Sequence, residues 1–210
     1  MDAGCVTAFW EATAHVIEPP RNGISPVIAS VTESWNVIDA WLAKNAPSSL
    51  AELRPPASPE AIKEAETELG FTLPADLRES LLCHDGDDAY TGVLPCGPLY
   101  STETIVEIRN MRMSIWDADD PDQQDDPWWG TLWVPFAGSD GDDHFIDAGP
   151  GQWHNHLGLA AHDDSACFVG WPSLAAWLHC VAQAMLHHND RGHIEPVHAP
   201  MLPGDGTVDW

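Results

Sequence analysis

The pattern of apolar and polar positions divides the chain into a helical first half and a second half rich in strand-forming residues. In the first half, apolar residues return every three or four positions, which is the spacing of one buried helix face. The first such face follows Ser30, which predicts a helix that begins there. Its apolar members are Val31, Trp35, Ile38, Trp41 and Leu42.

Three further helices are predicted before residue 116. One begins at Pro59 and ends before Gly70, because Pro fits the first turn of a helix and Gly commonly ends one. A second begins at Pro74 and stops at Gly86, and a third follows Ser101. The residues expected to face the core are Ile62, Ala65 and Leu69, then Leu77, Leu81 and Leu82, then Ile105, Ile108 and Ile115.

The second half contains short runs of aromatic and β-branched residues bounded by Gly, Pro and Asp. Such runs are typical of strands in a meandering antiparallel sheet. They are LWVPFA (132–137), HFID (144–147), WHNHLGLAAH (153–162) and ACFVG (166–170). A last helix is expected after Ser173, with a buried face formed by Leu174, Trp177, Leu178, Val181 and Met185.

Helices that are followed by strands and then by a closing helix indicate an α+β fold. A chain of 210 residues is long enough for one sizeable core. We therefore expect a single domain over residues 31–188. The Pro- and Gly-containing stretch before it marks residues 1–30 as an N-terminal extension, and residues 189–210 are expected to form an irregular C-terminal tail.

Charge narrows the possible partners. The chain has 33 acidic and 8 basic residues, a formal charge of −25, and residues 113–190 contain no Lys or Arg. Such a field repels the phosphates of nucleic acids and anionic membranes, so neither is expected to be a partner. It attracts a basic protein, although solubility alone could also explain the acidity.

Cysteine usage and hydropathy indicate where the chain is found. Five scattered cysteines without a CxxC pair fit reduced thiols better than a disulfide framework: Cys5, Cys83, Cys96, Cys167 and Cys180. The first residues lack the basic and apolar regions of a secretory signal, and no apolar stretch is long enough to span a membrane. We expect a cytoplasmic protein.

Several short motifs occur in a fixed order along the chain. The run LGFTLPAD (69–76) is followed by a Leu-rich helix that closes on His84–Gly86. LYSTETIVE (99–107) and WVPFAGSDGDDHFIDAGPG (133–151) come later. Together, over roughly residues 31–188, this ordered set resembles the Smi/Knr-type branch of the SUKH superfamily.

The resemblance implies an α+β fold with a curved antiparallel sheet packed by helices, no catalytic machinery, no cofactor, and use as a protein-binding module. Bacterial members of this family commonly act as immunity proteins that neutralise toxins, many of them nucleases, and fungal members act as scaffolds of cell-wall signalling. The Asp positions of the family's hairpin correspond to Asp143 and Asp147, for which we expect a structural role in the turn and no catalytic one.

The segment WDADDPDQQDDPWW (116–129) carries six Asp residues and has Trp residues at both ends. Carboxylates beside Trp rings can hold Lys or Arg of a partner through charge-assisted hydrogen bonds and cation–π contacts. The alternative is a hydrated loop whose Trp side chains belong to the core. The predicted partner-binding residues, which include the later DGDD turn, are Asp117, Asp119, Asp120, Asp122, Asp125, Asp126, Trp128, Trp129, Asp140, Asp142 and Asp143.

Metal binding and catalysis have weaker support. The DGDD runs at 85–88 and 140–143 supply oxygen ligands but lack the spacing of a calcium loop, and tight turns need the same residues. His154 and His156 would share one side of a strand, with His144, His162 or Asp163 as a third zinc ligand, but no HExxH or CxxC motif supports them. Cys83 and His84 are only a dipeptide, and no motif of an enzyme is present.

Three hypotheses follow. The preferred one is an immunity or antitoxin-type module whose acidic face covers the basic cleft of a toxin, plausibly a nuclease. The second is a regulatory scaffold whose acidity serves solubility. The third, a metal-dependent hydrolase that uses the histidines, would retain stoichiometric metal after dialysis. The oligomeric state and the name of the partner are not encoded in any pattern of the sequence.

Overall fold

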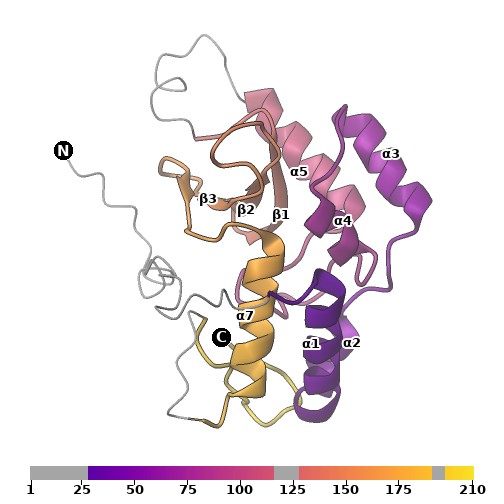
Figure 1. Cartoon of the computed structure of the whole chain (residues 1–210), viewed down its shortest axis with the longest axis vertical. Coiled ribbons are helices and arrows are strands. Elements are labelled where there is room, and N and C mark those ends of the chain that lie inside the picture. Colours follow the sequence, from indigo (N-terminus) through magenta and orange to yellow (C-terminus); the bar gives the residue numbers. More distant parts are fainter. Residues whose placement is uncertain (1–27, 116–127, 191–196) are drawn as a thin grey trace, which may run out of the picture.

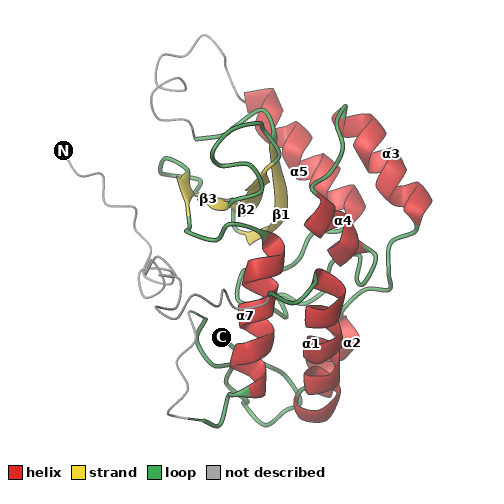
Figure 2. Ribbon diagram, in the orientation of Figure 1, coloured by secondary structure: helices red, strands yellow, loops and turns green. Residues whose placement is uncertain are grey.

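The computed structural model describes residues 28–115, 128–190 and 197–210. Within these ranges the chain forms six helices and one four-stranded antiparallel sheet, which confirms the α+β class (Figures 1 and 2). The elements are α1 (Val31–Asn45), α2 (Pro47–Glu52), α3 (Pro59–Leu69), α4 (Ala75–Leu81), α5 (Thr102–Ile115), β1 (Trp133–Ser139), β2 (Asp142–Asp147), β3 (Leu157–Ala160), β4 (Cys167–Phe168) and α7 (Leu174–Leu186).

Side-chain caps fix where the helices begin. Ser30 and Glu33 form a reciprocal capping box at the start of α1. Ser58 and Ser173 each accept a backbone N–H in the first turn of α3 and α7. Gly70 ends α3 in the left-handed conformation at φ 80°, which costs glycine little because it has no Cβ. These helix boundaries therefore follow from local sequence.

The sheet has the strand order β1-β2-β3-β4, so each strand pairs with the next along the chain. The register of β1 against β2 shifts between Pro135 and Ala137, which is a bulge of the kind that bends a strand. The outer edge of β1 is covered by the segment before α5. Here Tyr100 donates its backbone N–H to the Phe136 carbonyl at 2.9 Å, and Gly138 donates to the Pro98 carbonyl at 3.1 Å.

The main core lies between one face of the sheet and the helices. In Figure 1, α7 and α1 run side by side below the sheet, and α5 passes beside β1. The apolar faces predicted for α1 and α7 are buried in this core. Trp35 and Trp177, which belong to these faces, are each only 1% exposed. Phe136, Ile146 and Leu157 contribute from the sheet.

The opposite face of the sheet carries a smaller aromatic cluster of Trp129, Trp133, Phe145 and Ala160. The rings of Trp133 and Phe145 stack with centroids 3.9 Å apart. Gly158 lies opposite, and a Cβ added there would be 2.1 Å from Cζ of Phe145. The absence of a side chain at position 158 is therefore what lets this ring lie flat on β3.

Three details differ from the sequence-based expectations. Leu82 is 47% exposed and Ile115 is 61% exposed, because α4 ends at Leu81 and the last turn of α5 extends beyond the core. Ile108 is only half buried. Residues 152–155 form a turn, and the strand begins only at Leu157.

The C-terminal tail has no helix or named strand among its described residues 197–210, yet it packs against the body of the protein. Val197 and Val208 are part of the main core. Trp210 donates its Nε1–H to the Val93 carbonyl at 2.9 Å, and Ser48 at the start of α2 donates its N–H to the Gly206 carbonyl at 2.8 Å. These contacts tie the tail to α2 and to the loop before α5.

Candidate protein-binding surface

A buried ion pair organises the end of the sheet where β1 turns into β2. Arg112 of α5 donates from Nε to Oδ2 of Asp143 at 2.7 Å, and its Nη2 contacts the same oxygen and the Gly141 carbonyl. Tyr100 donates its hydroxyl to the other carboxylate oxygen of Asp143 at 2.6 Å. Asp143 is 2% exposed, so its carboxylate is used inside the fold and is not presented to a partner.

The same arginine contacts the aromatic end of the predicted acidic segment. Its guanidinium lies 5.9 Å from the ring centroids of both Trp128 and Trp129. Trp129 is fully buried, so it belongs to the core and not to a contact surface, whereas Trp128 is half buried. Asp117, Asp119, Asp120, Asp122, Asp125 and Asp126 lie outside the described residues.

The first two residues of the run 140–143 form the tight turn that the sequence predicted, and the last two begin β2. Asp140 and Gly141 take positive φ values of 54° and 93°. Asp140 is exposed. Asp142 accepts a hydrogen bond from the backbone N–H of His162 at 2.9 Å, and its carboxylate also pairs with Nδ1 of the His162 ring at 2.8 Å. Partial burial raises the pKa of Asp142, but the bonds and charge of His162 outweigh it and lower the pKa overall.

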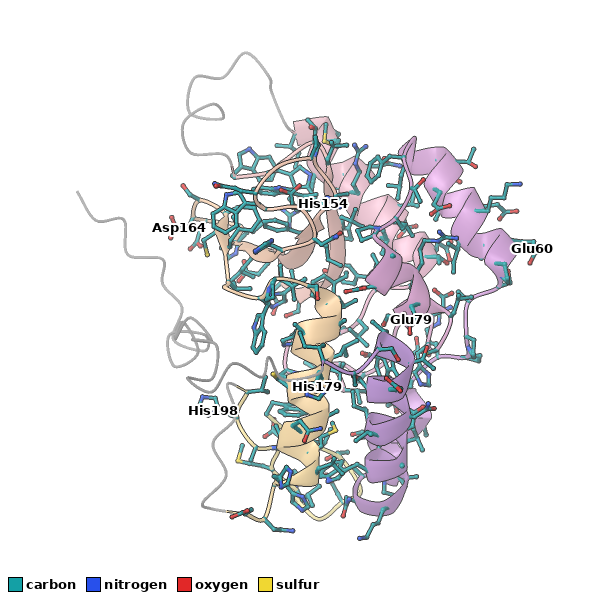
Figure 3. The ribbon with its side chains drawn as sticks, in the orientation of Figure 1. Glu60, Glu79, His154, Asp164, His179 and His198 are labelled. Atoms are coloured by element: carbon teal, nitrogen blue, oxygen red, sulfur yellow. The ribbon has the colours of Figure 1, made fainter. Side chains whose placement is uncertain are left out.

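Beside this turn lies an open hollow of about 300 Å³ on the sheet. Its lining consists of three apolar residues, Leu159, Ala161 and Cys167, and four polar ones, Asp142, Asp163, Asp164 and Ser165. Asp164 lies at this end of the molecule in Figure 3, away from Glu60 on α3. Asp163 and Asp164 were not among the predicted partner-binding residues, although two adjacent Asp in a stretch without basic residues could have signalled them.

The carboxylates of Asp85, Asp87 and Asp147 have structural roles. Asp85 accepts the N–H of Thr102 at 2.7 Å and so caps α5. Asp87 accepts the N–H groups of Ala89 at 3.0 Å and Leu99 at 2.9 Å, and burial raises its pKa to about 6. Asp147 accepts the Gly149 N–H at 2.7 Å, which fits the turn-holding role expected from the family resemblance.

The two histidines proposed as weak metal candidates do not share a strand. Both lie in the turn before β3, where Nδ1 of His154 is 3.0 Å from the Gly149 carbonyl and Nδ1 of His156 is 3.3 Å from the His154 carbonyl. Within the described ranges, no group of three or more His, Cys, Asp or Glu side chains is arranged to hold a metal ion.

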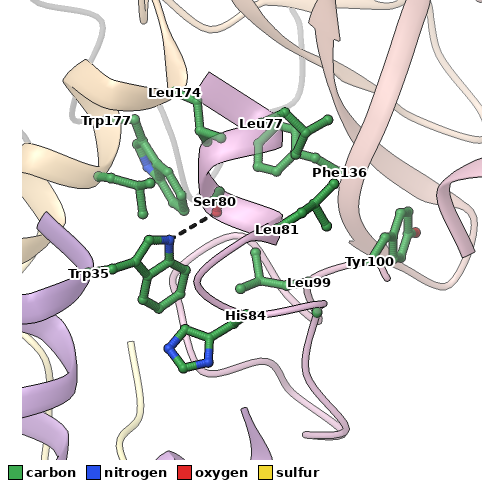
Figure 4. Close-up of a pocket in the computed structure, with 12 residues that line it drawn as sticks. Trp35, Leu77, Ser80, Leu81, His84, Leu99, Tyr100, Phe136, Leu174 and Trp177 are labelled. Atoms are coloured by element: carbon green, nitrogen blue, oxygen red, sulfur yellow. Dashed lines mark hydrogen bonds between the residues drawn. The ribbon is translucent and has the colours of Figure 1, made fainter. Parts of the chain in front are cut away.

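A small cavity is lined by Ser80 of α4 and by His84, among mostly apolar side chains (Figure 4). Both ring nitrogens of His84 are engaged, Nδ1 with the Arg54 carbonyl at 3.1 Å and Nε2 with Asp39 at 3.1 Å. Ser80 accepts from Trp35 Nε1 at 2.9 Å and has no hydrogen bond to His84. The cavity has about 10 Å³ of free space, room for one water molecule and not for a substrate.

No helix in the described part of the chain is long and apolar enough to cross a membrane.

Three curated relatives each match less than half of the chain. A "Glucan synthesis regulatory protein" of Neurospora crassa is 38% identical over 82 residues, 39% of this chain and 15% of the relative. A "KNR4/SMI1 homolog" of Yarrowia lipolytica is 35% identical over 97 residues, 45% of this chain and 14% of the relative. The "Cell wall biosynthesis/cell cycle regulator smi1" of Schizosaccharomyces pombe is 37% identical over 90 residues, 43% of this chain and 17% of the relative.

The chain thus spans about one sixth of the length of these relatives, two of which are named as regulators. The model of the SMI1 / KNR4 family (SUKH-1) matches residues 56–180. This range begins before α3 and ends within α7, so it takes in the sheet, the Arg112–Asp143 pair and the acidic hollow. Because the match covers more than half of the sequence, the chain belongs to the SMI1 / KNR4 family (SUKH-1).

Proposed function

We propose that this chain is a non-catalytic module that binds a basic protein through the acidic end of its sheet. In the immunity-type form of this proposal, the acidic surface covers the basic cleft of a toxin, plausibly a nuclease, and blocks it sterically and electrostatically. The supporting observation is the charge distribution. Asp140, Asp163 and Asp164 are exposed at one end of the sheet, and residues 113–190 carry no basic side chain.

The pairing of Arg112, the arginine that contacts the turn, supports this proposal. Arg112 is 7% exposed and its guanidinium is held by Asp143 and the Gly141 carbonyl. It therefore neutralises a buried carboxylate and leaves the outer carboxylates of the turn and hollow unpaired with Lys or Arg in the described structure. Uncompensated surface charge of one sign speeds the encounter with an oppositely charged partner and makes binding sensitive to salt.

A regulatory scaffold is the second candidate, and the names of the relatives favour it. Each of the three relatives is a much longer protein named for cell-wall or glucan-synthesis regulation or for this family. In that case the module would bind several cellular proteins, and the acidity would mainly maintain solubility. The two candidates differ in the number of partners and in how steeply binding depends on salt.

Affinity capture separates these candidates. Tagged full-length protein is incubated with lysate at low salt, bound proteins are released with a salt gradient, and the fractions are identified by mass spectrometry. One basic protein that is released only at high salt supports the immunity-type proposal. Several partners with weak salt dependence support the scaffold.

Charge reversal then tests the surface with the partner purified. The double variant Asp119→Lys, Asp120→Lys is compared with a control of equal charge change on α3, Glu60→Lys with Glu64→Lys, both exposed residues. We expect only the first variant to weaken binding and flatten its salt dependence. Equal affinities for the two variants would refute Asp119 and Asp120 as part of the contact.

A further inference from the structure

The apolar face of the sheet continues beyond the helices that cover it. Leu157 and Leu159 are two positions apart on β3, so their side chains lie on the same side of the sheet. Leu157 is 2% exposed and belongs to the main core, whereas Leu159 is half exposed. Cys167 pairs with Leu159 across β3 and β4 and is also half exposed. These two residues and Ala161 form the apolar floor of the hollow.

Carboxylates border this floor. Asp163 and Asp164 are exposed, and Asp142 closes the hollow from the β1–β2 turn. His162 pairs with Asp142, and this bond, together with the charge of Asp163, raises the pKa of His162. Asp164 accepts the backbone N–H of Ser165 at 2.8 Å. No Lys or Arg lines the hollow. Asp163 and Asp164 therefore lie next to each other above an apolar floor without a Lys or Arg partner in the described structure.

The volume and chemistry match one long cationic side chain. At about 300 Å³ the hollow is at the lower limit of small-ligand pockets. Lys and Arg place their methylene groups on apolar surface while the charged head stays with polar groups. Arginine fits better than lysine here, because its planar guanidinium can donate to two acceptors at once.

We propose that this hollow receives an arginine side chain of a basic protein partner, with its methylene groups on Leu159 and Cys167 and its guanidinium between Asp163 and Asp164. The proposal rests on the proposed function, since it specifies how the acidic surface recognises its partner. The hollow would fix the position and register of the bound partner, and the surrounding negative charge would increase the rate at which the two proteins meet.

The test uses the intact protein and a defined probe, the capped tripeptide Gly-Arg-Gly, with a citrulline counterpart that has the same shape but no charge. Amide chemical shifts are followed by NMR during titration. We expect saturable shifts at Ser165 and Cys167 with the arginine peptide and none with the citrulline peptide. The variant Asp163→Asn with Asp164→Asn should weaken binding about tenfold or more.

A matched control removes the same charge elsewhere. Glu60→Gln with Glu64→Gln on α3 should leave the peptide affinity within about twofold of the unchanged protein, since exposed charges this far apart are screened by salt. The Asn substitutions keep a side-chain oxygen for the bond from the Ser165 N–H to Asp164 Oδ1, so the turn is retained. Shifts spread over all acidic surfaces, or equal affinity in both double variants, would overturn the proposal.

The arginine site in the hollow and the proposed function can fail independently of each other. If a captured basic partner binds the Asp163→Asn, Asp164→Asn variant as tightly as the unchanged protein, the hollow is not its contact although the acidic module still is. If no basic partner is captured but the peptide binds at Ser165 and Cys167 as expected, the hollow is an arginine site and the immunity-type function is wrong.

Discussion

Arg112 on α5 and Asp143 on β2 are 31 residues apart in sequence and are joined by a hydrogen bond of 2.7 Å in a site that is almost closed to solvent. Removing one partner of such a pair leaves an uncompensated buried charge. We expect Arg112→Met to destabilise the protein by about 3–5 kcal/mol, measured by urea unfolding monitored by circular dichroism.

The double variant Arg112→Met with Asp143→Asn is the control for that prediction. It removes the orphaned charge and keeps an oxygen that can accept the hydroxyl of Tyr100. We expect it to recover part of the lost stability, because the cost of the single variant comes from the unpaired carboxylate. If the double variant is as unstable as the single one, packing of the Arg112 side chain, and not its charge, holds the turn.

Gly158 is predicted to be intolerant of the smallest side chain. An added Cβ would lie 2.1 Å from the Phe145 ring, which is stacked on Trp133 and has little freedom to move. We expect Gly158→Ala to cost about 1–3 kcal/mol, the range for overpacking in a dense core. In the background of Phe145→Leu the same substitution should cost less. Equal costs in both backgrounds would show that contact with the ring is not the cause.

Asp87 makes stability depend on pH in the opposite direction from most carboxylates. Burial raises its pKa from 3.8 to about 6, so the folded state holds a proton that the unfolded state has released. The contribution of Asp87 to the free energy of unfolding is complete below pH 3.8 and is lost as the pH rises through 6. The stability of the unchanged protein relative to Asp87→Asn should therefore fall by about 2–3 kcal/mol between pH 4 and pH 7.

Chemical denaturation at several pH values measures this difference. Glu60→Gln on the surface of α3 provides a reference substitution of an exposed carboxyl. The free energy of unfolding of the Glu60→Gln variant should differ from that of the unchanged protein by the same amount at every pH in this range. A constant offset between the unchanged protein and Asp87→Asn would show that the pKa of this carboxyl is not raised in the folded state.

The packed C-terminal tail is predicted to contribute to global stability. Deleting residues 204–210 removes the buried Val208 side chain and the hydrogen bond from Trp210 to Val93. We expect a loss of about 2–4 kcal/mol and a melting temperature several degrees lower by calorimetry. Met201→Ala, at a side chain that is 57% exposed, should change stability by less than about 0.5 kcal/mol.

Local signals explain which elements could be predicted from the sequence. Ser30, Ser58 and Ser173 cap helices through neighbours three residues away, so the starts of α1, α3 and α7 are visible in the chain itself. The family resemblance is confirmed by the family model, which matches residues 56–180. Leu82 and Ile115 were misplaced because the apolar spacing in the sequence continues past the point where α4 ends and where α5 extends beyond the core.

The candidate surface was harder to predict because burial there depends on distant residues. The sequence around Asp143 is typical of a surface turn. Asp143 is buried only because Arg112 and Tyr100, which are far away in sequence, form hydrogen bonds with its carboxylate. Trp129 is likewise covered by Trp133 and Phe145 of the sheet. The hollow with Asp163 and Asp164 arises from the pairing of β3 with β4, which no single segment encodes.

The way the sheet ends limits strand addition as a way to bind another protein. One outer strand, β1, already has backbone partners at Pro98 and Tyr100, and the other, β4, is only two residues long. Neither edge in the described structure offers a long row of free backbone groups onto which a foreign strand could add. The proposed contact with a basic protein is therefore expected to be made by side chains. Under that proposal, sequence changes on the acidic surface alter the choice of partner while the backbone of the module stays the same.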